Sequence, residues 1–153
     1  MPEGLLISFE GIDGSGKTTQ MDLLEPWLQS QDISYVRTIE PGGTQLGREI
    51  RDILFGSPGL AITPLAEAFL FAADRAQHFE DVVLLALKRG NVVITDRCFD
   101  SSIAYQGHAK GVGARLAESL SLQAMKSRIP DREEPAANYG ISIPVDRWVS
   151  PWL

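Results

Sequence analysis

Short apolar runs alternate along the chain with segments whose apolar residues recur at helical spacing. The run Leu5–Phe9 ends just before a glycine loop, and Thr18–Gln29 then carries apolar residues on one helical face. Ile33–Ile39 repeats the apolar run and stops at the turn Pro41–Gly43. This order predicts a strand, a glycine loop, a helix and a second strand.

The pattern continues as far as a third strand. Positions 46–54 mark one helix face, and Pro64–Lys88 contains no further Pro or Gly, which favours a long helix. Asn91–Thr95 is again a strand pattern, and Ala114–Lys126 fits an amphipathic helix. Strands that are apolar on both faces and alternate with helices predict an α/β fold with a covered parallel sheet.

The C-terminal part of the chain has no such pattern. Ser127–Leu153 contains four prolines and shows neither helical nor strand periodicity. We therefore expect a single domain over residues 1–131 and an irregular tail over residues 132–153.

Composition and charge narrow the classes of function. The chain has 153 residues, of which 44% are hydrophobic, and a formal net charge of −6, so no general basic surface for a nucleic acid polymer is expected. It contains no apolar run long enough for a membrane span and no basic signal-like start. The lone Cys98 suits a reducing compartment. We expect a cytoplasmic protein without membrane partners.

The glycine loop carries the strongest chemical signal. Residues 11–18 match the phosphate-loop pattern G-x-x-x-x-G-K-[ST] without a mismatch. Such a loop turns its backbone N–H groups toward one point, where the lysine reaches the outer phosphates and the Thr18 hydroxyl can ligate Mg²⁺. The alternative is an ordinary glycine turn with a solvated Lys17.

A second candidate lies at the end of the third strand. Asp96 and Arg97 follow this strand at the edge where parallel sheets bind ligands. Asp96 can hold Mg²⁺ through water, and Arg97 offers a planar fork for phosphate. The alternative is an internal ion pair that closes the strand end.

Other polar and aromatic residues suggest a base-binding pocket. Phe71 and Arg75 are four positions apart on the long helix and share a face, so that the ring can stack on a base while the guanidinium bonds its edge. Alternatively, Phe71 belongs to the core. The segment Ser101–Gly107 has the polar composition of a ligand pocket or of a surface loop. His78 and His108 have no matching ligands, and we assign neither to a metal.

Together these segments resemble the bacterial thymidylate kinases. The resemblance rests on Phe9–Gln20, Glu40–Thr44, Phe71–His78, and Asp96–Arg97 with the polar groups of 101–107, and it extends over residues 4 to about 131. It implies a three-layer sandwich of the P-loop nucleoside-monophosphate-kinase type, with a parallel sheet. It also implies transfer of the γ-phosphoryl of ATP to dTMP with Mg²⁺, by a homodimer.

The resemblance assigns roles to individual residues. Lys17, Arg97 and Asp13 become the catalytic candidates, and Thr18 and Asp96 the Mg²⁺ candidates. The ATP phosphates are expected at Gly11, Ile12, Asp13, Gly14, Ser15, Gly16, Lys17 and Thr18. The dTMP-binding candidates are Asp13, Arg51, Phe71, Arg75, Arg97, Ser102, Tyr105 and Gln106.

The chain departs from the family pattern after Pro130-Asp131. A fourth strand, an arginine-bearing lid and an adenine-binding segment are expected there in the family, and residues 132–153 show no pattern for them. We therefore expect an incomplete C-terminal part, from truncation or a frameshift soon after Asp131, with the domain of residues 1–131 being a P-loop kinase core. The alternatives to a dTMP kinase are a non-catalytic nucleotide-binding remnant and a kinase for another nucleoside monophosphate.

Overall fold

A four-stranded parallel sheet forms the centre of the computed structural model, which describes residues 4–135. The strands are β1 (Leu6–Glu10), β2 (Tyr35–Ile39), β3 (Val92–Asp96) and β4 (Arg132–Pro135). Their order is β2-β3-β1-β4, and all neighbouring pairs are parallel. The carboxyl ends of β1, β2 and β3 therefore meet at one edge, where the glycine loop leaves β1.

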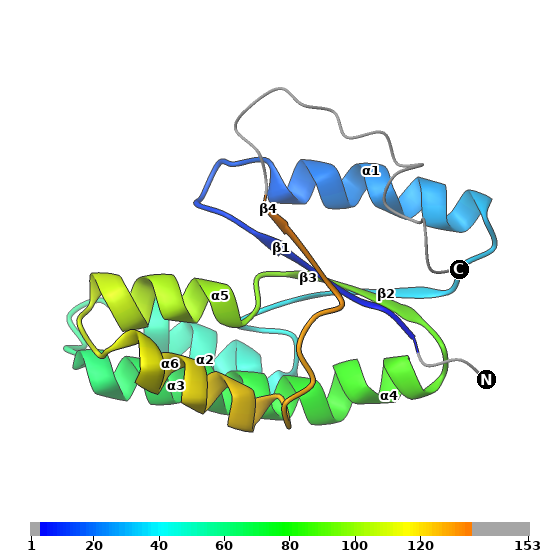
Figure 1. Cartoon of the computed structure of the whole chain (residues 1–153). Coiled ribbons are helices and arrows are strands. Elements are labelled where there is room, and N and C mark those ends of the chain that lie inside the picture. The colour runs from blue at the N-terminus through cyan, green and yellow to red at the C-terminus, as the bar shows by residue number, and fades with distance from the viewer. Residues whose placement is uncertain (1–3, 136–153) are drawn as a thin grey trace.

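Helices cover both faces of the sheet, which gives the three layers (Figure 1). Helix α1 lies on one face, and the other helices lie on the opposite side. Their bounds are α1 (Lys17–Ser30), α2 (Gln45–Phe55), α3 (Pro64–His78), α4 (Leu84–Lys88), α5 (Phe99–Ser102) and α6 (Ala114–Ala124). The π-helical segments η1 (Phe79–Val83) and η2 (Ile103–Ala109) continue α3 into α4 and extend α5.

The alternation of side chains along β1 and β3 produces two apolar clusters, one on each face of the sheet. Leu6 and Val93 point to one face, and Ile7 and Ile94 to the other. The first cluster comprises Leu6, Phe79, Val83, Ala86, Leu87, Val93, Cys98 and Met125. The second comprises Ile7, Phe9, Met21, Leu24, Leu28 and Ile94. Each large side chain buried in this way stabilises the fold by roughly 1.5–3 kcal/mol.

The elements predicted up to residue 126 are found close to their expected bounds. The long helix over Pro64–Lys88 is continuous, although its middle turn is π-helical. The segment Ser101–Gly107, for which a loop was one alternative, is helical. Thr44 and Thr63 cap α2 and α3, since their hydroxyls accept hydrogen bonds from backbone N–H groups.

The expectation of an irregular segment from residue 132, with no fourth strand, was wrong for Arg132–Pro135. These residues form β4, in parallel register with Ile7–Glu10. Asp131 starts the pairing: its carboxylate accepts from Leu6 N at 2.8 Å, and its own N–H donates to Leu6 O at 2.8 Å. Pairing with β1 thus sets this strand, which has no apolar pattern to predict it. Residues 136–153 of the expected tail lie outside the described part.

Candidate active site

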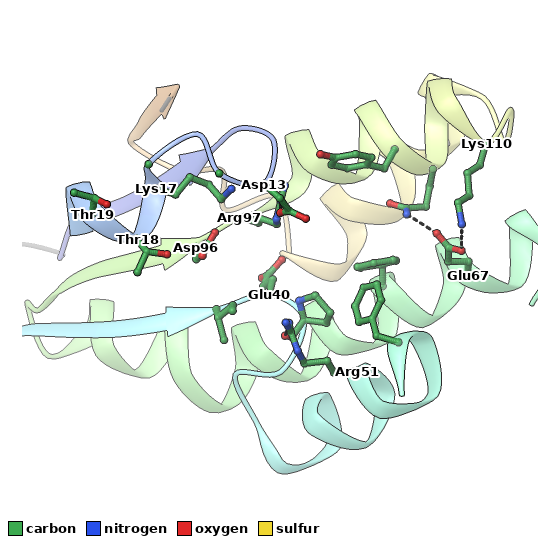
Figure 2. A pocket seen from close by; sticks show the side chains of 18 residues that line it. Asp13, Lys17, Thr18, Thr19, Glu40, Arg51, Glu67, Asp96, Arg97 and Lys110 are labelled. Carbon is green, nitrogen blue, oxygen red and sulfur yellow. Dashed lines mark hydrogen bonds and ion pairs between the residues drawn. The ribbon is translucent and has the colours of Figure 1, made fainter. Parts of the chain in front are cut away.

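A cavity of about 680 Å³ opens at the carboxyl ends of β1, β2 and β3. Lys17, Thr18 and Asp96 lie at one end of it, and Glu67 with Lys110 lies at the other (Figure 2). The sequence-predicted residues that line it are Asp13, Gly14, Gly16, Lys17, Thr18, Arg51, Phe71, Asp96, Arg97, Tyr105 and Gln106. The phosphate-loop, strand-end and aromatic candidates therefore share one cavity.

The glycine loop holds its lysine against its own backbone. Gly14 and Gly16 have φ values of 80° and 94°, which L side chains rarely adopt. Lys17 is buried, and its Nζ donates to the carbonyl oxygens of Gly11 and Ile12, each at 3.0 Å. Helix α1 starts here without a side-chain cap, so its first N–H groups remain open to an anion. This geometry contradicts a solvated lysine on an ordinary turn.

Thr18 and Asp96 suit a divalent cation held next to phosphates. Both line the same end of the cavity, one from the start of α1 and the other from the end of β3. Asp96 Oδ1 is buried and has no hydrogen-bond partner among residues 4–135. An unpartnered carboxylate oxygen and a hydroxyl are hard oxygen donors, which Mg²⁺ prefers. The residues present therefore fit the Mg²⁺ implied by the phosphate-loop motif.

Arg97 is tied to the glycine loop, not to its neighbour Asp96. Its Nη2 donates to Asp13 Oδ1 at 2.7 Å, and its Nη1 donates to Ser101 Oγ at 3.1 Å. Its guanidinium also lies over the Tyr105 ring, 5.5 Å from the centroid. The alternative of an Asp96–Arg97 ion pair is thus not what the structure shows. Asp13, Arg97 and Tyr105 instead form a connected wall of the cavity.

Glu10 supports this wall from the end of β1. Its carboxylate accepts from Cys98 N at 2.7 Å and from Ser101 Oγ at 2.5 Å. Burial raises the pKa of Glu10 above its ordinary value, against the effect of these two hydrogen bonds. Ser101 Oγ also accepts from Arg97 Nη1. Glu10 therefore holds the hydroxyl that fixes this nitrogen, while Asp13 accepts from the other terminal nitrogen, Nη2.

Arg75 and Ser102 do not line the cavity; both are buried. Arg75 Nη2 donates to Ser102 Oγ at 3.1 Å, and Nε donates to Glu40 Oε2 at 2.7 Å. Further bonds from its two terminal nitrogens reach Ser121 Oγ and Cys98 O. A guanidinium has five N–H donors, and protein acceptors take up four hydrogen bonds here. The prediction that Arg75 bonds a base edge stays a prediction, with one donor left for it.

Glu40 is the acceptor at the centre of this buried network. Its Oε1 lies 2.9 Å from His78 Nδ1, and Thr38 Oγ1 lies 2.6 Å from His78 Nε2. An ionised carboxylate only accepts, so Nδ1 carries the proton. Burial raises the pKa of Glu40, but the Arg75 charge and the His78 hydrogen bond outweigh burial and hold the pKa below its ordinary value. His78 thus serves as a buried structural donor.

Phe71 belongs to the cavity wall and not to the main core. It lies edge-on to Phe55, with 6.4 Å between the ring centroids. Arg51 places its guanidinium 5.5 Å from the Phe55 ring centroid and donates to Pro41 O at 2.9 Å. Phe55 and Phe71 thus form an apolar part of the cavity wall, with the Arg51 cation at its rim, and we call this part the aromatic slot.

Comparison with known proteins gives the family. The family model described as "Thymidylate kinase" matches residues 9–132. The chain belongs to the thymidylate kinase family. It is 52% identical over 132 residues to "Thymidylate kinase" of Bifidobacterium longum (strain DJO10A), covering 84% of this chain and 64% of that protein. It is 48% identical over 129 residues to "Thymidylate kinase" of Pelotomaculum thermopropionicum, covering 84% of this chain and 60% of that protein.

A solved structure confirms the fold. The crystal structure of thymidylate kinase from Ehrlichia chaffeensis matches with a TM-score of 0.80 and 39% identity, over 88% of this chain and 75% of that chain. The resemblance to the family and the α/β fold with a parallel sheet are therefore confirmed. The chain spans about three fifths of the length of the curated relatives that it matches. No helix within residues 4–135 is long and apolar enough to cross a membrane.

Some cavity residues of this family member were missed by the sequence reasoning. They are Thr19, Ile39, Glu40, Pro41, Phe55, Glu67 and Lys110. Glu67 could have been found, because it precedes Phe71 by four positions and shares its helix face. No sequence pattern indicated Lys110, because its position at the cavity follows from the way α5 and η2 fold into one helical stretch.

Asp74 is a buried carboxyl that is only half satisfied. Its Oδ1 accepts from Gly42 N at 3.0 Å, while its buried Oδ2 has no partner among the described residues. Burial is the main cause that raises the pKa of Asp74 from its ordinary value of 3.8 to about 6. The folded state thus favours the protonated form. Stability from this group is fully present below about pH 4 and is lost as the pH rises through about 6.

We expect Asp74→Asn to remove the loss of stability that accompanies ionisation of the Asp74 carboxyl. An amide keeps an acceptor for Gly42 N and carries no charge, so the variant should be more stable than the unsubstituted chain by roughly 1–3 kcal/mol above pH 6. The difference should shrink toward about pH 4. Urea unfolding across this pH range measures it. Asp52→Asn, at an exposed position on α2, is the matched control. Parallel stability profiles for the Asp74 variant and the unsubstituted chain would contradict the assignment.

Proposed function

We propose that the chain forms the phosphate-binding and nucleoside-binding parts of a dTMP kinase, which transfers the γ-phosphoryl of ATP to dTMP and yields ADP and dTDP. One observation carries the proposal: the phosphate loop and the aromatic slot around Phe71 open into the same cavity, with Arg97 on the wall between them. Donor and acceptor phosphates are thereby brought to one place. The relatives named "Thymidylate kinase" support this function.

The donor side is the end of the cavity at the glycine loop. The open N–H groups at the start of α1 bind the ATP phosphates, and Lys17 turns from the loop carbonyls toward the outer phosphates. Thr18 and Asp96 would hold Mg²⁺, which neutralises charge on the phosphate oxygens when bound. The main chemical task of these groups is to fix the γ-phosphorus in position.

The acceptor side is the aromatic slot and its charged rim. Phe71 stacks on thymine, and Tyr105 and Gln106 line the nucleoside pocket. Arg97 binds the dTMP phosphate, Asp13 lies near the sugar and phosphate, and Arg51 assists at the same phosphate from α2. Phosphoryl transfer needs alignment and charge neutralisation more than covalent help, and these cations supply both.

The proposal includes a cytoplasmic homodimer that acts on nucleotide monomers. Its support is the exposure of apolar side chains such as Leu46, Ile53 and Leu116 on α2 and α6, which a second copy of the chain would cover. Sedimentation equilibrium tests the dimer, and a monomer at all protein concentrations would contradict that part.

The test of the function is ADP release from ATP in the presence and absence of dTMP. We expect dTMP-dependent release, and Lys17→Ala should lower it by roughly 100-fold or more, because a phosphate clamp is lost. The affinity for dTMP should stay close to that of the unsubstituted chain. ADP release within about threefold in the variant would reject the role of Lys17. Saturable binding of both nucleotides without ADP release would support the non-catalytic alternative.

A second prediction concerns the base. Phe71→Ala should weaken dTMP binding by roughly 10- to 100-fold, because stacking area is lost, while ATP binding changes little. Phe69→Ala is a matched control on the same helix, since Phe69 is 52% exposed and does not line the cavity. Calorimetric titration with each nucleotide gives the affinities. Equal losses for ATP and dTMP would show that Phe71 only supports the fold.

A further inference from the structure

Glu67 links the two helical segments that close the far end of the cavity. It lies in the first turn of α3, one turn before Phe71, and lines the cavity. Its Oε1 accepts from Gln106 Nε2 at 2.8 Å, and its Oε2 pairs with Lys110 Nζ. Figure 2 shows both interactions as dashed lines at the end of the pocket opposite the glycine loop. Gln106 and Lys110 both line the same cavity.

This contact fixes which way the Gln106 amide faces. An ionised carboxylate only accepts hydrogen bonds, and its pairing with Lys110 balances its charge, so the amide nitrogen of Gln106 must lie against Glu67. The side chain of Gln106 is buried, at 4% exposure, and its carbonyl oxygen bonds to no group within residues 4–135. The Gln106 carbonyl oxygen is therefore a fixed acceptor at the cavity, and one of the two N–H donors of the amide is already used by Glu67.

We propose that Glu67 is a positioning residue that sets base specificity: by holding the Gln106 amide nitrogen, it fixes the carbonyl oxygen as an acceptor, so that the site selects pyrimidines with an N–H at ring position 3. This rests on the proposed function, which places the base at Phe71 and Gln106. Thymine and uracil carry that N–H, whereas neutral cytosine carries a lone pair at the same atom.

The selection follows from the pairing of donors and acceptors. Against thymine, the Gln106 carbonyl gains a hydrogen bond. Against cytosine, two acceptors face each other. A free glutamine would turn its amide over and donate to cytosine instead. Glu67 prevents this turn, because the flipped amide would place a carbonyl oxygen against a carboxylate. Specificity at this atom therefore depends on Glu67 acting through the Gln106 amide.

The test compares dTMP and dCMP binding to the full chain by calorimetry. In Glu67→Gln, residue 67 both donates and accepts, so the Gln106 amide is no longer fixed. We expect the ratio of dTMP affinity to dCMP affinity to fall by roughly tenfold or more. A purely structural role of Glu67 would weaken both nucleotides by the same factor and leave the ratio unchanged. An unchanged ratio in a variant that melts like the unsubstituted chain overturns the proposal.

An exchange of the two side chains provides the rescue. In the double variant E67Q/Q106E, an amide at 67 donates to a carboxylate at 106, whose second oxygen again offers the base an acceptor. The affinity ratio should return toward the original value, and failure to recover in a folded double variant counts against the proposal. The matched control is Glu80→Gln, which breaks the exposed Glu80–Lys126 ion pair away from the cavity and should leave the ratio unchanged.

The same titrations separate this proposal from the function on which it rests. Absence of dTMP binding to the unsubstituted chain would contradict the proposed function and the role of Glu67 together. A preference for dTMP over dCMP that survives Glu67→Gln would leave the function standing and overturn the role of Glu67 alone.

Discussion

A carboxylate and a guanidinium are buried together beside the cavity: Glu40 Oε2 lies 2.7 Å from Arg75 Nε, and both side chains are at most 3% exposed. Through this pair, the end of β2 is joined to α3, and through the other donors of Arg75 to α5 and to Ser121 of α6. Removing one partner would leave a buried charge without compensation, at a cost of about 3–5 kcal/mol. The segments around the cavity are thus held in a common arrangement by one desolvated charge pair.

That arrangement lets side chains from distant segments act on a common space. The end of β3 shows how: the chain leaves the strand at Asp96, and Arg97 takes a left-handed φ of 73° that few residues adopt. The Asp13 carboxylate and the Ser101 hydroxyl hold its guanidinium across the wall of the cavity. Backbone strain at this residue is offset by these hydrogen bonds, which hold the guanidinium in place at the cavity wall.

The parts that the sequence predicted are those whose physics is local. The glycine loop depends on a few consecutive residues, and the shared face of α3 follows from a four-residue spacing. Lys17 and Phe71 line one cavity, and their roles toward nucleotides stay predictions. The burial of Arg75 was not predictable in this way, because its four acceptors come from three segments far apart in the chain, at Glu40, at Cys98–Ser102 and at Ser121. Likewise, β4 forms because it pairs with β1, and no hydrophobic pattern within Arg132–Pro135 predicts a strand there.

The buried network also has a consequence for how sequences of this kind can diverge. Arg37 pairs with Asp22 and Glu25 on the surface, where water can replace any one partner and each position is free to vary almost independently. Around Arg75 no single position has that freedom: Glu40, Ser102 and Ser121 each satisfy a donor that has no access to water. Change there must come as a coordinated replacement of several residues, so the buried network beside the cavity is expected to be inherited as a block while exposed ion pairs vary position by position.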